Sequence, residues 1–170
     1  MKSDYGRWEN GGGYTLVPTN PPQYVTLWPL WWRKRQLWEY TADHTNPPTF
    51  ICRDGSQYRN DYHCITDNGS IPPIVTWLFG IDPMGFLPCY VWHDMLYQHG
   101  GCWKLVNGIW VFIPMTQDEC DQMLREMLLA SGCPPWQAQV VYEGLKMGGF
   151  IAWRGHAKRR EQEEQKRKAA

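Results

Sequence analysis

The chain has 170 residues, which is the size of one domain with a single core. Its content of 43% hydrophobic and 20% charged residues excludes an intrinsically disordered chain. The 17 Lys and Arg balance the 17 Asp and Glu, so nucleic-acid binding is not expected. No apolar leader is visible, and no run approaches the roughly 18 continuous apolar residues that a membrane span needs. We therefore expect synthesis in a cytoplasm and no export by the usual secretory route.

The first 36 residues are expected to form an extended arm with little regular structure. Gly, Pro, Asn and Thr dominate residues 1–26, and these residue types favour turns and irregular segments. The stretch LWPLWWRKRQLW at 27–38 mixes indole rings with basic side chains. This mixture suits a membrane interface or a surface that packs against protein. We favour packing against the rest of the chain or against a partner.

Residues 37–66 are expected to form a small antiparallel sheet. Three short β-prone runs, LWEYT, TFICR and DYHCIT, occur there, and DGS at 54–56 is a turn signal between the last two. TDNGSIPP at 66–73 then interrupts the strand pattern, and residues 74–81 resemble a short helix that ends at Gly80. The six cysteines include no C-x-x-C pair, so a structural zinc knuckle is not expected. We expect mostly free thiols, several of them buried.

Three helices are expected after this sheet. The first begins at Pro88 and stops at Gly100-Gly101. Asn107-Gly108 between two β-prone runs predicts a hairpin, and Thr116 with Glu119 forms a capping box for a second helix that ends at Gly132. A third helix runs from Pro135 to Gly148-Gly149. The remaining residues, 154–170, are a charged tail with seven Lys or Arg and three Glu.

These elements predict an α+β domain over residues 37–153, between the arm and the tail. A small antiparallel sheet precedes two helices that a β-hairpin joins, and a third helix follows. Because the connection is short, the first two helices should be antiparallel neighbours.

An adjacent histidine and aspartate on the first helix are the main candidates for chemistry. His93 and Tyr97 are four residues apart and share a helix face, whereas Asp94 points about 100° away. Asp121 falls on or beside the inward face of the second helix, opposite His93. There it could accept the imidazole N–H and set the tautomer, and Tyr97 could donate to the same carboxylate. A network that serves only the structure is the alternative.

The pattern resembles the secreted phospholipase A2 superfamily, in which C-C-x-x-H-D-x-C-Y on one helix faces C-D on an antiparallel helix. The matching residues here are Cys89, His93, Asp94, Tyr97 and Cys120-Asp121. The resemblance implies that His93 is the general base, that Asp121 and Tyr97 orient it, and that Asp94 binds calcium. The glycine-rich calcium loop of that superfamily has no counterpart here. Asp67 is therefore the second candidate metal ligand, and Asn68 and Ser70 are candidates to line the site.

A second resemblance covers residues 37–153. The order T-D-x-x-S-I-P, H-D-x-L-Y, an aspartate on the next helix and G-G-x-x-A-W is similar to an uncharacterised phage and prophage family, domain of unknown function 1353. The matching residues are Thr66-Asp67, Ser70-Ile71-Pro72, His93-Asp94, Leu96-Tyr97, Asp121, Gly148-Gly149 and Ala152-Trp153. This resemblance implies a phage origin, synthesis in a host cytoplasm and a common site.

Two functions from different classes fit these residues. The first is a hydrolase in which His93 activates water against an ester, most plausibly in a phospholipid, with a cell-wall amide as a variant substrate. A serine mechanism with Ser70 as nucleophile ranks lower, because G-x-S-x-G is absent. The second is a virion component of the tail or baseplate, whose N-terminal arm would lie on neighbouring phage proteins.

Overall fold

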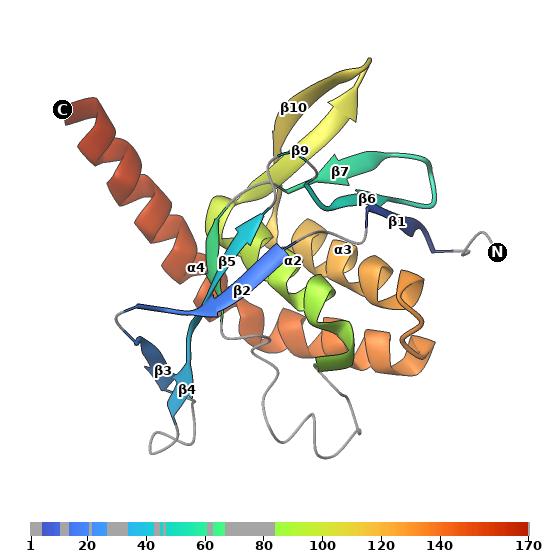
Figure 1. Ribbon diagram of the computed structural model, residues 1–170, viewed down its shortest axis with the longest axis horizontal. Helices are drawn as coiled ribbons and strands as arrows, with labels where there is room; N and C mark the ends of the chain where they lie inside the picture. Colours follow the sequence, from blue (N-terminus) through green and yellow to red (C-terminus); the bar gives the residue numbers. More distant parts are fainter. Residues whose placement is uncertain are drawn as a thin grey trace.

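The computed structural model describes residues 5–10, 14–20, 22–26, 34–42, 45, 47–60, 63–66 and 84–169. Within these ranges the chain is an α+β protein, as expected (Figure 1). The strands are β1 (Arg7–Asn10), β2 (Tyr14–Pro18), β3 (Tyr24–Thr26), β4 (Lys34–Gln36), β5 (Trp38–Ala42), β6 (Thr49–Ile51), β7 (Gln57–Arg59), β8 (Cys64–Thr66), β9 (Gly101–Val106) and β10 (Ile109–Pro114). A 3-10 turn, η1 (Met84–Phe86), precedes the helices α2 (Leu87–His99), α3 (Gln117–Ala130) and α4 (Pro135–Ala169).

The strands form three antiparallel sheets rather than the one small sheet expected. The largest has the order β1-β6-β7-β9-β10, the second has the order β2-β5-β8, and β3 pairs with β4. The three β-prone runs of residues 37–66 do form strands. However, β6 is not in the sheet that holds β5 and β8. It belongs to the first sheet, which also contains the additional strand β7. Pro47 and Pro48 immediately precede β6, and this rigid segment lets the chain turn away from β5.

The expectation of an irregular arm over residues 1–36 is wrong for the parts that the structure describes. β1 pairs with β6, and β2 pairs with β5 over five residues. Trp8 of β1 packs edge-on against Phe50 and Trp92, with ring centroids 5.2 and 5.3 Å away. Long-range pairing of this kind leaves little signal in local composition, because the partner strand supplies the backbone hydrogen bonds. The amino-terminal segment is thus part of the sheet structure.

Helices α2 and α3 agree with the expectation to within one or two residues. Gly100 ends α2 in the left-handed region with φ of 72°, and its N–H donates to the Leu96 carbonyl. Thr116 and Glu119 form both hydrogen bonds of the capping box at the start of α3. The turn between β9 and β10 has Asn107 and Gly108 at positive φ, as the hairpin prediction requires.

Helix α4 is longer than expected. It does not stop at Gly148-Gly149 but continues to Ala169, so the described part of the charged tail is helical and largely exposed. Ion pairs between successive turns, such as Lys168 with Glu164 at 2.6 Å, support this exposed end. Gly149 fits inside this helix because it lies where α4 packs closely against α2.

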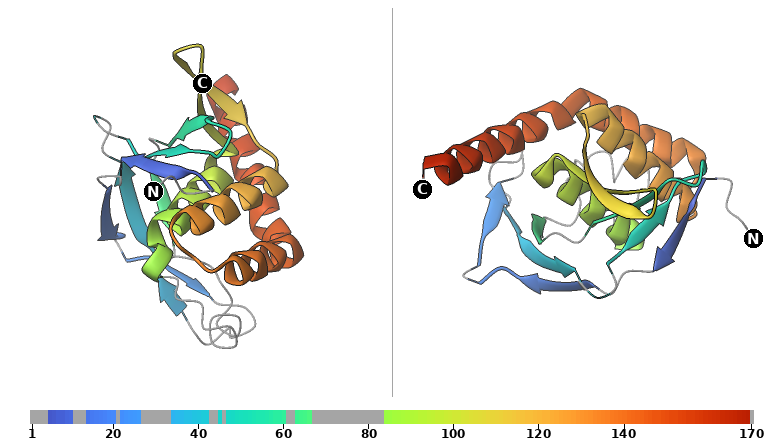
Figure 2. Two further views of the ribbon diagram at one scale, coloured as in Figure 1. Left: turned by 90° about the vertical axis from the view of Figure 1, so that its right-hand side faces the viewer. Right: turned by 90° about the horizontal axis from the view of Figure 1, so that it is seen from above.

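Helix α2 is the centre of the molecule. The right-hand view of Figure 2 shows it between the strands on one side and α3 and α4 on the other. Eight of its thirteen residues are buried, among them Trp92 and Leu96 at 1% and 0% exposed. The described helices include none that is long and apolar enough to cross a membrane.

Candidate active site

The site lies where α2 faces α3. His93 and Tyr97 are one turn apart on α2, so both side chains point to the same side of the helix. Asp121 is in the first half of α3, just after the capping box. Cys89 at the start of α2 contacts Ser131 beyond the end of α3, which shows that the helices are antiparallel. The short hairpin produces this arrangement and brings Asp121 opposite His93 and Tyr97, as predicted.

Asp121 accepts hydrogen bonds from both residues of α2. Its Oδ1 atom is 2.8 Å from Nε2 of His93 and 2.7 Å from the hydroxyl of Tyr97. The rings of His93 and Tyr97 are packed together, with centroids 4.3 Å apart. The side chain of Asp121 is fully buried, and that of His93 is 7% exposed. The three side chains therefore form one buried polar cluster between the helices.

The hydrogen bonds assign protons within this cluster. A carboxylate only accepts, so Nε2 of His93 carries the proton that it shares with Asp121. In the neutral imidazole the other nitrogen, Nδ1, then has a free lone pair. No described residue hydrogen-bonds to Nδ1. Burial and the hydrogen bond to Asp121 raise the pKa of Tyr97, so its hydroxyl stays a donor.

Asp94 belongs to a different contact. Its Oδ2 atom accepts a hydrogen bond from the hydroxyl of Thr66, the last residue of β8. Thr66 is 1% exposed and immediately precedes the TDNGS turn. This bond holds the end of β8 against α2 at Asp94. The candidates Asp67, Asn68 and Ser70 lie outside the described part of the chain.

The described residues do not form a calcium shell around Asp94. Calcium takes six to eight oxygen ligands, and no group of three or more His, Cys, Asp or Glu suited to a metal occurs in the described residues. The role of Asp94 as a metal ligand, together with Asp67, thus stays a prediction.

The thiol of Cys89 on α2 is not a thiolate nucleophile. Cys89 is one turn before His93, but its Sγ atom contacts the hydroxyl of Ser131 at 3.4 Å. Burial raises the pKa of Cys89 to about 11, so the thiol stays protonated at neutral pH. The six cysteines are free, and five of them are buried, as expected.

Helix α4 adds contacts that the sequence did not reveal. Trp153 packs edge-on against Tyr97 at 5.2 Å, and Gly149 is so close that a Cβ atom there would be 2.7 Å from the Tyr97 hydroxyl. Both residues belong to the G-G-x-x-A-W motif, so this motif supports the Tyr97 side of the cluster. Gln117, four residues before Asp121 on α3, donates to Oδ2 at 3.4 Å. Its i, i+4 spacing to Asp121 is the one signal that could have identified it.

The chain matches a protein-family model. The model described as protein of unknown function (DUF1353) matches residues 49–145, which is more than half of the chain. This chain is a member of that family. The matched region contains His93, Asp94, Tyr97 and Asp121, whereas Gly149 and Trp153 follow it. No curated protein and no solved structure matches the chain.

Proposed function

We propose that this DUF1353 protein is a hydrolase in which His93 activates a water molecule to attack an ester. The observation that carries the proposal is the hydrogen bond from Nε2 of His93 to the buried carboxylate of Asp121. It orients the imidazole, and it leaves the Nδ1 lone pair as the base.

The reaction can be written with these residues alone. Nδ1 of His93 takes a proton from water while the water oxygen bonds to the ester carbonyl carbon. The imidazolium that forms is stabilised by Asp121, and the fixed hydroxyl of Tyr97 holds that carboxylate in place. The tetrahedral intermediate then expels the alcohol as its C–O bond breaks, and His93 returns the proton to the leaving oxygen.

Phospholipid is the first substrate to test, because the His-Asp helix and its aspartate partner resemble those of the phospholipases A2. The assay is fatty-acid release from mixed phospholipid vesicles, with calcium and with a chelator. We expect His93→Gln to lower the rate of fatty-acid release by about 10²–10⁴-fold, the usual contribution of a general base. Dependence on calcium would make Asp94 the next residue to replace.

His63→Gln is the matched control. His63 also pairs with a carboxylate, that of Glu39 at 2.7 Å, but its side chain is 52% exposed and outside the cluster. It should keep full activity. If the unmodified protein releases nothing from lipid, from a soluble ester or from cell-wall amides, while it remains folded, the hydrolase proposal is wrong. The cluster would then serve the structure, as a virion component requires.

A further inference from the structure

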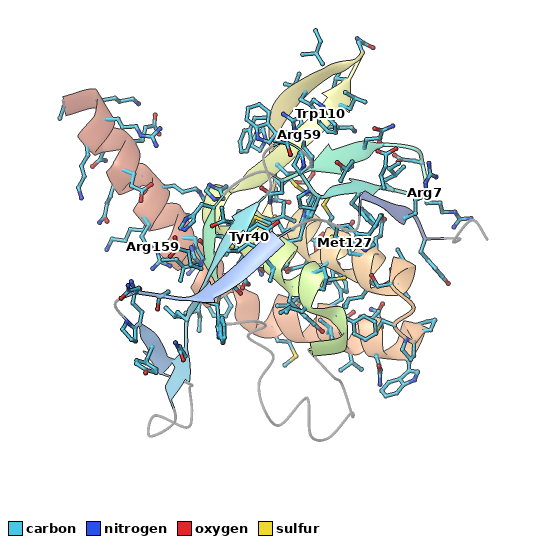
Figure 3. The ribbon with its side chains drawn as sticks, viewed as in Figure 1. Arg7, Tyr40, Arg59, Trp110, Met127 and Arg159 are labelled. Carbon is cyan, nitrogen blue, oxygen red and sulfur yellow. The ribbon has the colours of Figure 1, made fainter. Side chains whose placement is uncertain are left out.

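A polar groove lies on the face of α2 that carries Asp94 and Gln98, about 100° around the helix from His93 and Tyr97. Its volume is about 720 Å³, and it is bounded by α4, by the end of α2 and by residues of the β-strand side. From α2 it is lined by Asp94 and Gln98, and from α4 by a run of charged residues that starts at His156. Figure 3 labels Arg159 on this stretch of α4.

Arginines dominate the α4 wall. Arg159, Arg160 and Arg167 line the groove, and none of them forms an ion pair with a described carboxylate. Arg160 is committed to the fold: it donates to the Tyr97 and Gln98 carbonyls at the end of α2. It also lies over the Trp153 ring at 5.0 Å. Arg159 and Arg167 are exposed and make no such contact with the described residues of α2.

Three carboxylates line the groove, and one of them is paired with a lysine. Glu164 is paired with Lys168 at 2.6 Å, and Asp94 accepts from Thr66. Glu163 is the remaining carboxylate of the lining. Asp94 and Glu163 keep their negative charges, because a neutral hydroxyl does not neutralise a carboxylate, so the three arginines leave only a small positive balance at the groove.

His156 adds a neutral donor. A guanidinium has no acceptor atom, so the 3.2 Å contact between Arg159 and Nδ1 of His156 is a hydrogen bond from Arg159. The proton of the neutral imidazole is then on Nε2, as an N–H donor. Burial, together with the nearby Arg159 and Arg160, lowers the pKa of His156 to about 4. Burial is the larger cause, and the positive charges of Arg159 and Arg160 add to it.

We propose that this groove binds a phosphate group, with Arg159 and Arg167 as charged donors and Nε2–H of His156 as a neutral donor. Guanidinium groups match phosphate oxygens in geometry as well as in charge. The same chemistry fits free phosphate and a lipid headgroup. This inference does not depend on the hydrolase proposal, because binding is measured without turnover.

The experiment titrates the full-length protein with inorganic phosphate, followed by NMR shifts of backbone amides and of the His156 ring. A second arm measures co-sedimentation with phosphatidylcholine vesicles that contain phosphatidic acid. The double variant Arg159→Gln/Arg167→Gln should weaken binding at least about tenfold, since two charge-assisted hydrogen bonds are lost. Glu163→Gln should tighten binding, because it removes a negative charge that repels phosphate.

Arg154→Gln is the matched control. Arg154 is on the same helix, but its guanidinium lies over the Phe150 ring at 5.6 Å and does not line the groove. Thermal unfolding checks that all variants are folded. Loss in the double variant alone supports the site, and the arm in which it occurs identifies free phosphate or lipid as the ligand. Absence of binding in both arms, or an equal loss with Arg154→Gln, overturns the proposal.

Discussion

Asp121 shows at the scale of one residue how a charge is kept in the core. Its side chain is fully buried, and burial of an isolated carboxylate would cost several kcal/mol. Three donors offset this cost: His93, Tyr97 and, at a longer distance, Gln117. Because the buried carboxylate cannot form a replacement hydrogen bond with water, removal of one donor should lower the free energy of unfolding. The hydroxyl of Tyr97 is the donor that can be removed with least change in shape.

Replacement of Tyr97 by Phe should lower the free energy of unfolding by about 1–3 kcal/mol, the usual cost of a lost hydrogen bond to a charged group. Urea unfolding followed by tryptophan fluorescence measures the difference. Tyr142→Phe is the matched control, because Tyr142 also donates to an aspartate of α3, Asp118, at 2.8 Å, but at an exposed position. The control should change stability by less than about 0.5 kcal/mol. Equal losses in both variants would show that burial of Asp121 is not the cause.

Helix α4 illustrates the element scale, because two adjacent glycines within it meet different surroundings. A Cβ atom on Gly149 would be 2.7 Å from the Tyr97 hydroxyl and 3.1 Å from Nε2 of Gln117, whereas one on Gly148 would meet no atom within 4 Å. The absence of a side chain at Gly149 thus lets α4 approach the polar cluster. Gly148 has no such role and only weakens the helix.

Substitution of each glycine by Ala should therefore act in opposite directions. Gly149→Ala should destabilise the protein by about 1–3 kcal/mol, as overpacking does, and should disturb Tyr97. Gly148→Ala should stabilise it by about 0.5–1 kcal/mol through helix propensity. Thermal and urea unfolding of the pair measure both effects. A gain for Gly149→Ala would mean that α4 does not pack closely on α2.

At the scale of the whole molecule, the family match does not contain the entire structure. The matched residues 49–145 exclude β1, which pairs with β6, and the part of α4 that packs on Tyr97. Trp8 links β1 to the core: besides its two ring contacts, its Nε1 atom donates to Ser131 after α3 at 3.1 Å. The amino-terminal segment should thus contribute to global stability.

Trp8→Ala should lower the free energy of unfolding by about 2–4 kcal/mol, toward the range for loss of a large aromatic side chain. Trp136→Ala is the control, since Trp136 is on α4 and 54% exposed. It should cost less than about 1 kcal/mol. Denaturant midpoints compare the two. A negligible effect of Trp8→Ala would indicate that the first strand is an independent arm, as the composition first suggested.

The elements that were predicted well are those whose signals are local. The capping box of Thr116, the turn at Asn107-Gly108 and the stop at Gly100 depend on backbone geometry within a few residues. The pair of His93 with Asp121 was also accessible, because helix periodicity and a short connection suffice to place both side chains. Helix periodicity does not place the candidate site residues that lie outside these helices.

What the sequence alone determined is therefore the order of α2, hairpin and α3, and the polar cluster between the two helices. Only the tertiary structure decided that β1 joins β6, that β5 and β6 belong to different sheets, and that α4 passes through Gly148-Gly149. It also decided the Thr66–Asp94 contact and the capping of α2 by Arg160. These features depend on partners that are far apart in the chain, and their energy comes from packing and burial that no local pattern records.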